Sequence, residues 1–220
     1  SNNSGSDVDL QADGDDPPGS GNDLSSLVAW DLSAVPDGAV IESASIEIEV
    51  FNGSTGSYQF YEVKRDWNES QATWNEAASG SGWSQPGASH TDDRGTQALA
   101  TISASSTGTY SVDLGADGLS VLQAWVDGVR PNNGFILAND ATIDGLDFHS
   151  SEASTAAYRP KLTLSYVIPD LNQAPTAGFT HGVSDLTASF TDTSSDSDGT
   201  IASWSWDFGD MSGVSTSQNP

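Results

Sequence analysis

The sequence predicts an all-β fold: an antiparallel, jelly-roll-like β-sandwich with one short helix, followed by a second and smaller β unit. Three observations support this prediction. Apolar residues recur mainly with a period of two, Gly, Pro, Asn and Asp separate the alternating runs, and one segment alone has helical spacing. Many short strands with turn residues between them are typical of a sandwich.

The alternating runs follow one another along the first part of the chain. In SIEIEV, Ile46, Ile48 and Val50 share one face, while the intervening glutamates occupy the other, as a half-buried strand requires. Three more runs repeat this pattern: Val28, Trp30 and Leu32; Tyr110, Val112 and Leu114; and Leu162, Leu164 and Tyr166.

The helical segment is DGLSVLQAWVDG. Leu119, Leu122 and Val126 recur there at helical spacing. We expect Asp117 to cap the first turn and Gly128 to end the helix, which would pack across one end of the sandwich.

The string VIPDLNQAPTAGF, with two prolines directly after a finished strand, is typical of an interdomain linker. We place the first domain at 1–168, the linker at 169–174 and the second domain at 175–220. In the second domain, ASFTD and SWSWDF are expected to be strands.

Composition excludes several classes of function. The chain of 220 residues has no cysteine, so disulfides and thiolate sites are excluded. Its formal net charge of -25 opposes binding to nucleic acid or to anionic lipid. The sequence contains no apolar run long enough for membrane insertion.

After the linker, APTAGF, LTASFTDTSSDSDGTIASWSWDFGD and QNP resemble the PKD domain, an immunoglobulin-like sandwich of extracellular proteins. The match covers Asn172 to Pro220, and WDFGD is its most specific part. That family continues with further strands after QNP, so we expect a truncated PKD domain. Met211 stands where the family usually has a glycine.

The first part resembles the DNRLRE family, a β-sandwich related to carbohydrate-binding module family 96. The matching pieces cover almost everything from Asp7 to Tyr166: LQADGDDPPGSGND, SLVAWDLSAVPDGAVIESASIEIEV, DWNESQATWN, LQAWVDGVRPNNGFIL, DFHSSE and RPKLTLSY. In this family a strand precedes the DGDDP segment, so we expect the first strand to be missing.

The stretch SSDSDG is a candidate site for structural calcium. Asp196 and Asp198 are two residues apart and precede a glycine, an arrangement that suits a hard cation. The PKD resemblance adds Asn172 and Gln173 as ligands. The alternative is a turn in which the aspartates bond to their own backbone. The other acidic stretch, DGDDPPGSGND, also offers oxygen atoms that suit a cation, but we interpret it as a solvated loop.

Trp83, Trp74 and Tyr58 are the candidate carbohydrate-binding residues, because the C–H face of a sugar ring stacks on an aromatic ring. Trp83 lies among small and turn residues in SGSGWSQPG and is the best candidate for an exposed platform; alternatively it folds back as a lid on the core. Trp74 and Trp67 both belong to the DWNESQATWN motif, which indicates packing as the alternative role of each. Trp30 and Trp125 are expected in the core.

The sequence contains few residues in arrangements that are typical of catalytic sites. The chain has three histidines, and none lies in a nucleophile elbow, a HExxH helix or a phosphate-binding glycine loop. We expect His149 to be structural and the chain to have no catalytic residues, so it is not an enzyme.

These observations and resemblances predict a non-catalytic accessory region of a larger secreted or cell-surface bacterial protein, covalently linked to neighbouring domains. Its sandwich would bind polysaccharide and its PKD part would act as a spacer. The alternatives are a purely structural stalk or adhesive module, and the tail of an extracellular hydrolase, lyase or phosphoesterase. Related modules are associated with alginate, but the net charge opposes an anionic ligand unless calcium bridges the charges or salt screens them; otherwise the ligand is neutral.

Overall fold

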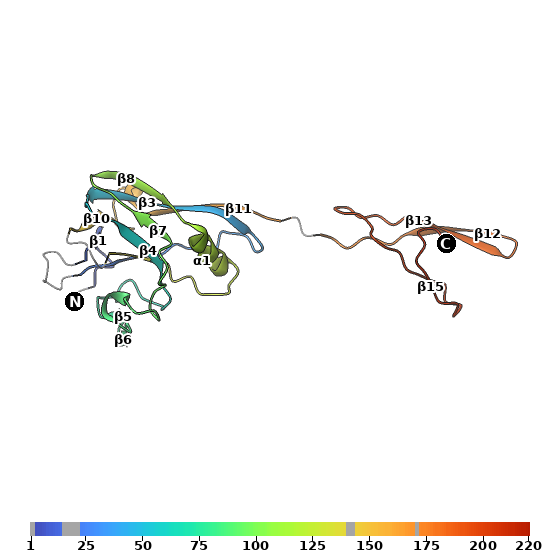
Figure 1. Cartoon of the computed structure of the whole chain (residues 1–220), viewed down its shortest axis with the longest axis horizontal. Coiled ribbons are helices and arrows are strands. Elements are labelled where there is room, and N and C mark those ends of the chain that lie inside the picture. Colours follow the sequence, from blue (N-terminus) through green and yellow to red (C-terminus); the bar gives the residue numbers. More distant parts are fainter. Residues whose placement is uncertain (1–2, 15–22, 140–143, 170–171) are drawn as a thin grey trace. The chain divides into compact units, whose positions relative to one another are not determined.

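A computed structural model describes residues 3–14, 23–139, 144–169 and 172–220. The chain divides into two compact units, Ser1–Pro169 and Asp170–Pro220. Figure 1 shows both units along the chain. Their division falls inside the segment 169–174 that the sequence predicts as a linker, whereas most of the acidic loop DGDDPPGSGND lies outside the described residues.

Two antiparallel sheets form the sandwich of the first unit. The five-stranded sheet comprises β1 (Asp9–Ala12), β10 (Leu146–His149), β3 (Val40–Asn52), β11 (Lys161–Val167) and β8 (Gly108–Asp113). The four-stranded sheet comprises β2 (Ser26–Val28), β9 (Phe135–Ala138), β4 (Tyr58–Glu62) and β7 (Ala100–Ile102). Both sheets contribute side chains to one buried cluster, so they pack face to face as the predicted sandwich.

β3 is the longest strand and confirms the period-two pattern. Ile46, Ile48 and Val50 are buried, while Glu47 and Glu49 between them are partly exposed. The inward side chains meet those of β4, including Phe60, in the main core. Trp30 and Leu32 lie beyond the end of β2 at Val28, so that run is shorter than expected, although both side chains still pack against the core.

The single α-helix, α1, spans Ala116–Val126 and packs against the beginning of β3. The Ile41 N–H donates to Gln123 Oε1 (2.8 Å), and Gln123 Nε2 donates to the Ala39 carbonyl (2.9 Å). Trp125 is buried as expected. Gly128 follows the helix with a φ of 66°, as the sequence predicts, because this left-handed geometry favours glycine.

The predicted helix cap is wrong. Gly115 occupies the cap position without a side-chain hydrogen bond, and Asp117 lies within the first turn. An acidic side chain there still favours the helix, because the helix dipole is positive at its N-terminus.

A long connection between β4 and β7 contains the hairpin β5 (Glu76–Ala78) and β6 (Ser81–Gly82) and the 3-10 turn η1 (Pro86–Ala88). It packs on a second, smaller core that contains Val63, Ala77, Trp83, Ala88 and Ile136. A second 3-10 turn, η2 (Ala156–Tyr158), precedes β11. This connection therefore covers the outer side of β4 and β9.

The second unit has two short antiparallel ladders. β12 (Phe179–Ser184) pairs with β13 (Thr187–Asp192), and β14 (Trp206–Asp207) pairs with β15 (Val214–Ser215). ASFTD is therefore in a strand, but only the Trp-Asp step of SWSWDF is. After Asp210 the chain is bonded back to β13, since the Phe190 N–H donates to the Pro220 carbonyl (3.1 Å).

Candidate functional site

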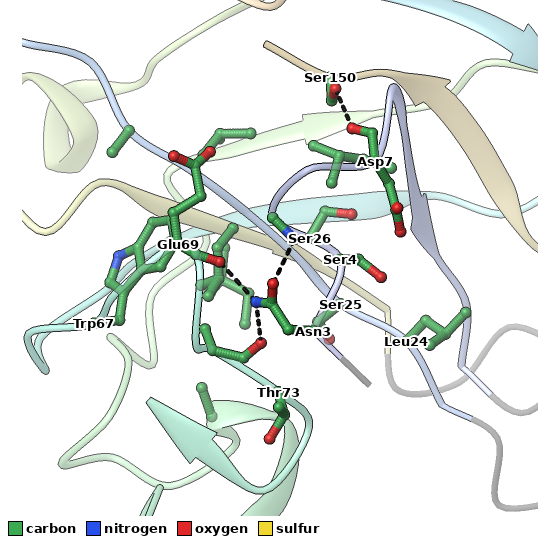
Figure 2. Close-up of a pocket in the computed structure, with 18 of the residues that line it drawn as sticks. Asn3, Ser4, Asp7, Leu24, Ser25, Ser26, Trp67, Glu69, Thr73 and Ser150 are labelled. Atoms are coloured by element: carbon green, nitrogen blue, oxygen red, sulfur yellow. Dashed lines mark hydrogen bonds between the residues drawn. The ribbon is translucent and has the colours of Figure 1, made fainter. Parts of the chain in front are cut away.

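A cleft of about 480 Å³ opens on the first unit, beside β2 and the β4–β7 connection. Figure 2 shows Trp67, Glu69 and Thr73 on one side and Asp7, Leu24 and Ser150 on the other, with Asn3 between them. Its aromatic lining comes from Trp30, Trp67, Trp74 and Trp83, and its polar lining includes Asp7, Ser25, Ser26, Glu69, Thr73 and Ser150. A volume of this size suits a small ligand or a few units of a polymer.

The fold uses the indole N–H groups of three of the four tryptophans that line the cleft. Each of these groups donates to a backbone carbonyl: Trp30 to Pro160 (3.2 Å), Trp67 to Asn133 (2.8 Å) and Trp83 to Thr73 (2.9 Å). These bonds also fix the ring orientations. A ligand in the cleft would therefore meet these three indoles through C–H and π contacts.

Trp74 is positioned by Gly87 in η1. A Cβ atom at Gly87 would lie 2.3 Å from the Trp74 ring, and Gly87 has a φ of 70°. The Gly87 N–H also donates to the Trp74 carbonyl (2.7 Å). Glycine is required here both by the backbone conformation and by the close approach of the indole.

The N-terminal segment forms another wall of the cleft. Asn3 Nδ2 donates to the carbonyls of Glu69 (2.6 Å) and Ala72 (2.7 Å), which Figure 2 shows as dashed lines. Ser150 Oγ donates to the Asp7 carbonyl (2.6 Å). Segments far apart in sequence are thus tied together around one opening.

The structure brings together two of the three predicted carbohydrate-binding residues. Trp74 and Trp83 both line the cleft, although an exposed platform at Trp83 is wrong. Only 8% of Trp83 is exposed, because its ring packs on the smaller core as the alternative lid. Trp83 therefore lines the cleft with only a small exposed part of its side chain.

Tyr58 is far less accessible than a sugar-stacking residue requires, and this expectation is wrong. It is fully buried in β4, in phase with Phe60. Its hydroxyl donates to Ser54 Oγ (2.8 Å) and to the Asp144 carbonyl. The Thr55 N–H bonds the Asp144 carboxylate (2.9 Å) and lowers its pKa, so this group belongs to a structural turn.

The sequence reasoning missed Trp67, Glu69 and the N-terminal segment. The motif DWNESQATWN contributes Trp67, Glu69, Thr73 and Trp74 to the cleft, together with Ala72. Its density of aromatic and polar residues was the available signal. The packing role that the sequence indicates for Trp67 is present as well, because Trp67 packs against the smaller core while it lines the cleft.

In the second unit, the candidate calcium ligands lie close together. Asp196 Oδ1 accepts from the N–H groups of Asp198 (3.3 Å) and Gly199 (3.0 Å), and Asp198 Oδ2 accepts from the Gln173 N–H (2.9 Å). Asp196 Oδ2 and Asn172 Oδ1 both approach the same side of Gly199. The turn is therefore present, and a group of three or more His, Cys, Asp or Glu side chains is not found among the described residues.

His149 has structural partners on the outer face of the five-stranded sheet. Its ring stacks on Tyr158, with centroids 5.1 Å apart, and its Nδ1 lies 3.1 Å from Asp9 Oδ1. The Phe51 ring also packs against it at a tilt, with centroids 5.0 Å apart. These contacts account for His149 without catalysis.

Two further findings concern the class of protein. In the described part of the chain, no helix has the length and apolar character needed to cross a bilayer. Residues 1–166 match the family model described as carbohydrate-binding module family 96. This match covers far more than half of the sequence, and the chain therefore belongs to carbohydrate-binding module family 96.

Proposed function

We propose that the first unit binds a polysaccharide chain in the cleft beside β2. As a member of its family, the unit is a carbohydrate-binding accessory module, a non-catalytic class whose members are usually extracellular. The observation that carries the proposal is the lining: four tryptophans beside hydroxyl and carboxylate groups. Indole faces stack on sugar C–H groups, and the polar groups bond to sugar hydroxyls.

The affinity of a single cleft for polysaccharide is expected to be low. The cleft is open to solvent, and a polysaccharide must lose conformational freedom when it is held there. Repeated modules in a longer protein would compensate through effective concentration. We accordingly propose that the chain is an accessory region of a larger secreted or cell-surface bacterial protein.

Affinity electrophoresis in gels containing single polysaccharides tests the cleft directly. Trp74→Ala removes a stacking surface, and Glu69→Ala removes an exposed polar side chain of the same wall. Each variant is expected to bind at least about tenfold more weakly, the equivalent of roughly 1.4 kcal/mol. The thermal melt of each variant is measured in parallel, because Trp74 also packs against Gly87.

Phe51→Ala is the matched control. Phe51 is an exposed aromatic residue on the outer face of the five-stranded sheet, outside the cleft. This variant is expected to bind like the parent protein. Loss of binding in Phe51→Ala with retention in the cleft variants would place the site on the outer sheet instead. No binding to any polysaccharide would contradict the function and favour the purely structural stalk.

For the second unit we propose a PKD-type spacer that holds calcium at Asp196, Asp198, Asn172 and Gln173. The support is that Asn172 and Gln173 lie against the turn formed by Asp196 and Asp198. Two carboxylates supply little negative charge. The dissociation constant for calcium is therefore expected to be roughly 10⁻⁴ to 10⁻³ M, as is typical of extracellular modules.

A calcium titration followed by amide NMR tests this proposal. Amides 196–199 are expected to shift in the parent protein and to stop shifting in Asp196→Asn/Asp198→Asn. Asp185→Asn, in the exposed turn between β12 and β13, is the control and should behave like the parent. Unchanged amides at about 10 mM calcium would contradict the proposal.

A further inference from the structure

We infer that residues 3–8 form a detachable strap that closes on a glycan bound in the cleft. The strap opens without unfolding of the sandwich, and a bound glycan holds it closed. This inference rests on the proposed function, because it concerns the same cleft. It follows from three properties of the strap: its place in the cleft lining, the contacts that hold it, and its exposure to solvent.

The strap is part of the cleft lining. Four of its six residues line the cleft: Asn3, Ser4, Gly5 and Asp7. Figure 2 shows Asn3 between the wall that carries Trp67 and the wall that carries Ser150. A glycan in the cleft would therefore contact the strap as well as the tryptophans. Its affinity depends on where the strap lies, because an open strap withdraws these contacts.

Hydrogen bonds to the rest of the fold hold the strap at both ends. At its start, the Asn3 amide donates to two carbonyls of residues 69–72, as described above. At its end, Ser150 bonds it twice: its Oγ donates to the Asp7 carbonyl (2.6 Å) and its N–H donates to the Val8 carbonyl (2.9 Å). These bonds join neutral groups, and each contributes only modestly to stability where water can replace it.

The strap buries little surface. The structure describes all of residues 3–8, of which Gly5 is half-buried and the other five are exposed. Val8 is the apolar member of the strap, and 52% of it is exposed. Apolar packing begins further along the chain, with Leu10 against the main core and Ala12 fully buried. Opening the strap therefore leaves the core intact, and its free-energy cost is well below that of unfolding the unit.

Gly5 allows the strap to approach the opposite wall closely. A Cβ atom at Gly5 would lie 2.0 Å from the Glu69 carbonyl oxygen and 2.7 Å from its carbonyl carbon. These are backbone atoms, so they cannot move aside as the end of a flexible side chain can. The φ of Gly5 is not in the left-handed region, so this contact alone opposes a side chain there. Gly5→Ala is therefore expected to release the strap without straining its backbone.

Amide hydrogen exchange in the full chain, followed by NMR, measures closure of the strap. Ser150 is the main reporter, because its N–H bond to the Val8 carbonyl exists only when the strap is docked. The Gly5 and Asp7 N–H groups, which bond within the strap, are two further reporters. Val129 is the control amide, because it donates to a carbonyl of α1 and lies outside the cleft lining.

Alginate, galactomannan, xylan and laminarin serve as probes, and exchange is compared with and without each polysaccharide that the parent protein binds. In the free protein, the three reporter amides are expected to exchange at least about tenfold faster than the central amides of β3. At a polysaccharide concentration of about ten times Kd, their exchange should slow about tenfold, because the open state binds the probe far less tightly. The exchange rate of Val129 should not change.

Two variants release the strap in different ways: Gly5→Ala by steric overlap, and Asn3→Ala by removal of both bonds to residues 69–72. In each, the Ser150 amide is expected to exchange at least about threefold faster, and the polysaccharide to bind at least about threefold more weakly. Gly82→Ala is the matched control. A Cβ atom at Gly82 would lie 3.6 Å from its nearest atom, and Gly82 is outside the cleft lining, so this variant should behave like the parent protein.

Faster Ser150 exchange together with weaker binding in both variants supports the strap. Faster exchange with unchanged binding overturns it, because the strap would then not contact the glycan. Tighter binding also overturns it, because the strap would then exclude the glycan from the cleft. Exchange as slow as in the parent protein in both variants would show that these contacts do not hold the strap, which overturns it as well.

The strap and the function on which it rests fail in different ways. Reporter amides that do not slow when a polysaccharide binds overturn the strap, while glycan binding by the first unit stands. Failure of every probe to bind the parent protein overturns the proposed function, and the strap with it.

Discussion

Gly87 lies directly against the indole of Trp74, so closely that a Cβ atom would come within 2.3 Å of the ring. We predict that Gly87→Ala destabilises the first unit by about 2–4 kcal/mol, from the left-handed backbone and the steric overlap together. Urea unfolding followed by circular dichroism measures this.

Gly80→Ala provides the matched control for that variant. Gly80 has a φ of 76°, but no atom lies within 4 Å of its Cβ position. It should therefore lose only the backbone component, roughly 1–2 kcal/mol. Equal losses of stability in both variants would show that the close contact with Trp74 does not contribute to the effect of Gly87→Ala.

The ion pair between Arg65 and Asp93 is predicted to hold the connection that carries Gly87. Asp93 is fully buried, and its carboxylate accepts from Arg65 Nε (2.8 Å) and from the Gln85 N–H (3.2 Å). Arg65→Ala leaves that charge buried without its guanidinium partner, which we expect to cost about 2–3 kcal/mol, because Arg65 itself is partly exposed.

An exposed ion pair serves as the comparison. Lys161→Ala breaks the pair with Glu47 on the outer face of the five-stranded sheet. The expected loss is about 0.5 kcal/mol or less. Thermal melts of the two variants should therefore differ clearly, and a larger loss in Lys161→Ala would refute the argument from burial.

Asp192 makes the stability of the second unit depend on pH. Bonds from Ser194, chiefly its side chain and then its N–H, lower the pKa of Asp192 from 3.8 to about 2, with further bonds from Trp204 and Gln218. Because the folded-state pKa is depressed, the stabilisation is complete above about pH 4 and is lost as the pH falls toward 2.

This dependence can be measured by amide hydrogen exchange in β13 and by tryptophan fluorescence between pH 6 and pH 2. Asp192→Asn should remove the part of the transition that belongs to this carboxyl. The control variant Asp185→Asn should retain the full pH transition of the parent protein. A parent protein whose second unit is equally stable at pH 2 and pH 5 would contradict the assignment.

Met211 occupies a conformation that favours glycine. Its φ is 67° and its side chain is fully exposed, so no packing is lost on removing it. Met211→Gly is expected to stabilise the second unit by about 0.5–1 kcal/mol. Met211→Ala keeps the strain and should have little effect; equal stabilisation in both variants would show that backbone conformation is not the cause. Chemical unfolding monitored by NMR compares them.

Local pattern predicted the secondary structure well where one face of an element is buried. β3 follows the alternation of SIEIEV residue by residue, and α1 lies where the helical spacing indicates. The errors occur at the ends of elements, as at Gly115 and at Val28, because caps and strand ends depend on which backbone partners remain within reach. Those partners belong to other segments.

The sequence by itself determined an all-β sandwich with one helix and the acidic character that opposes anionic partners, because hydrophobic period and charge are local or summed properties. Only the tertiary structure decided which tryptophans line the cleft. Trp67 and Trp74 reach the cleft because the connection carrying them folds against β2 and is tied to Asn3, which is 66 residues from Glu69. The orientation of three indoles in the cleft is likewise a tertiary property, since each of their N–H groups donates to a backbone carbonyl that the fold brings to it.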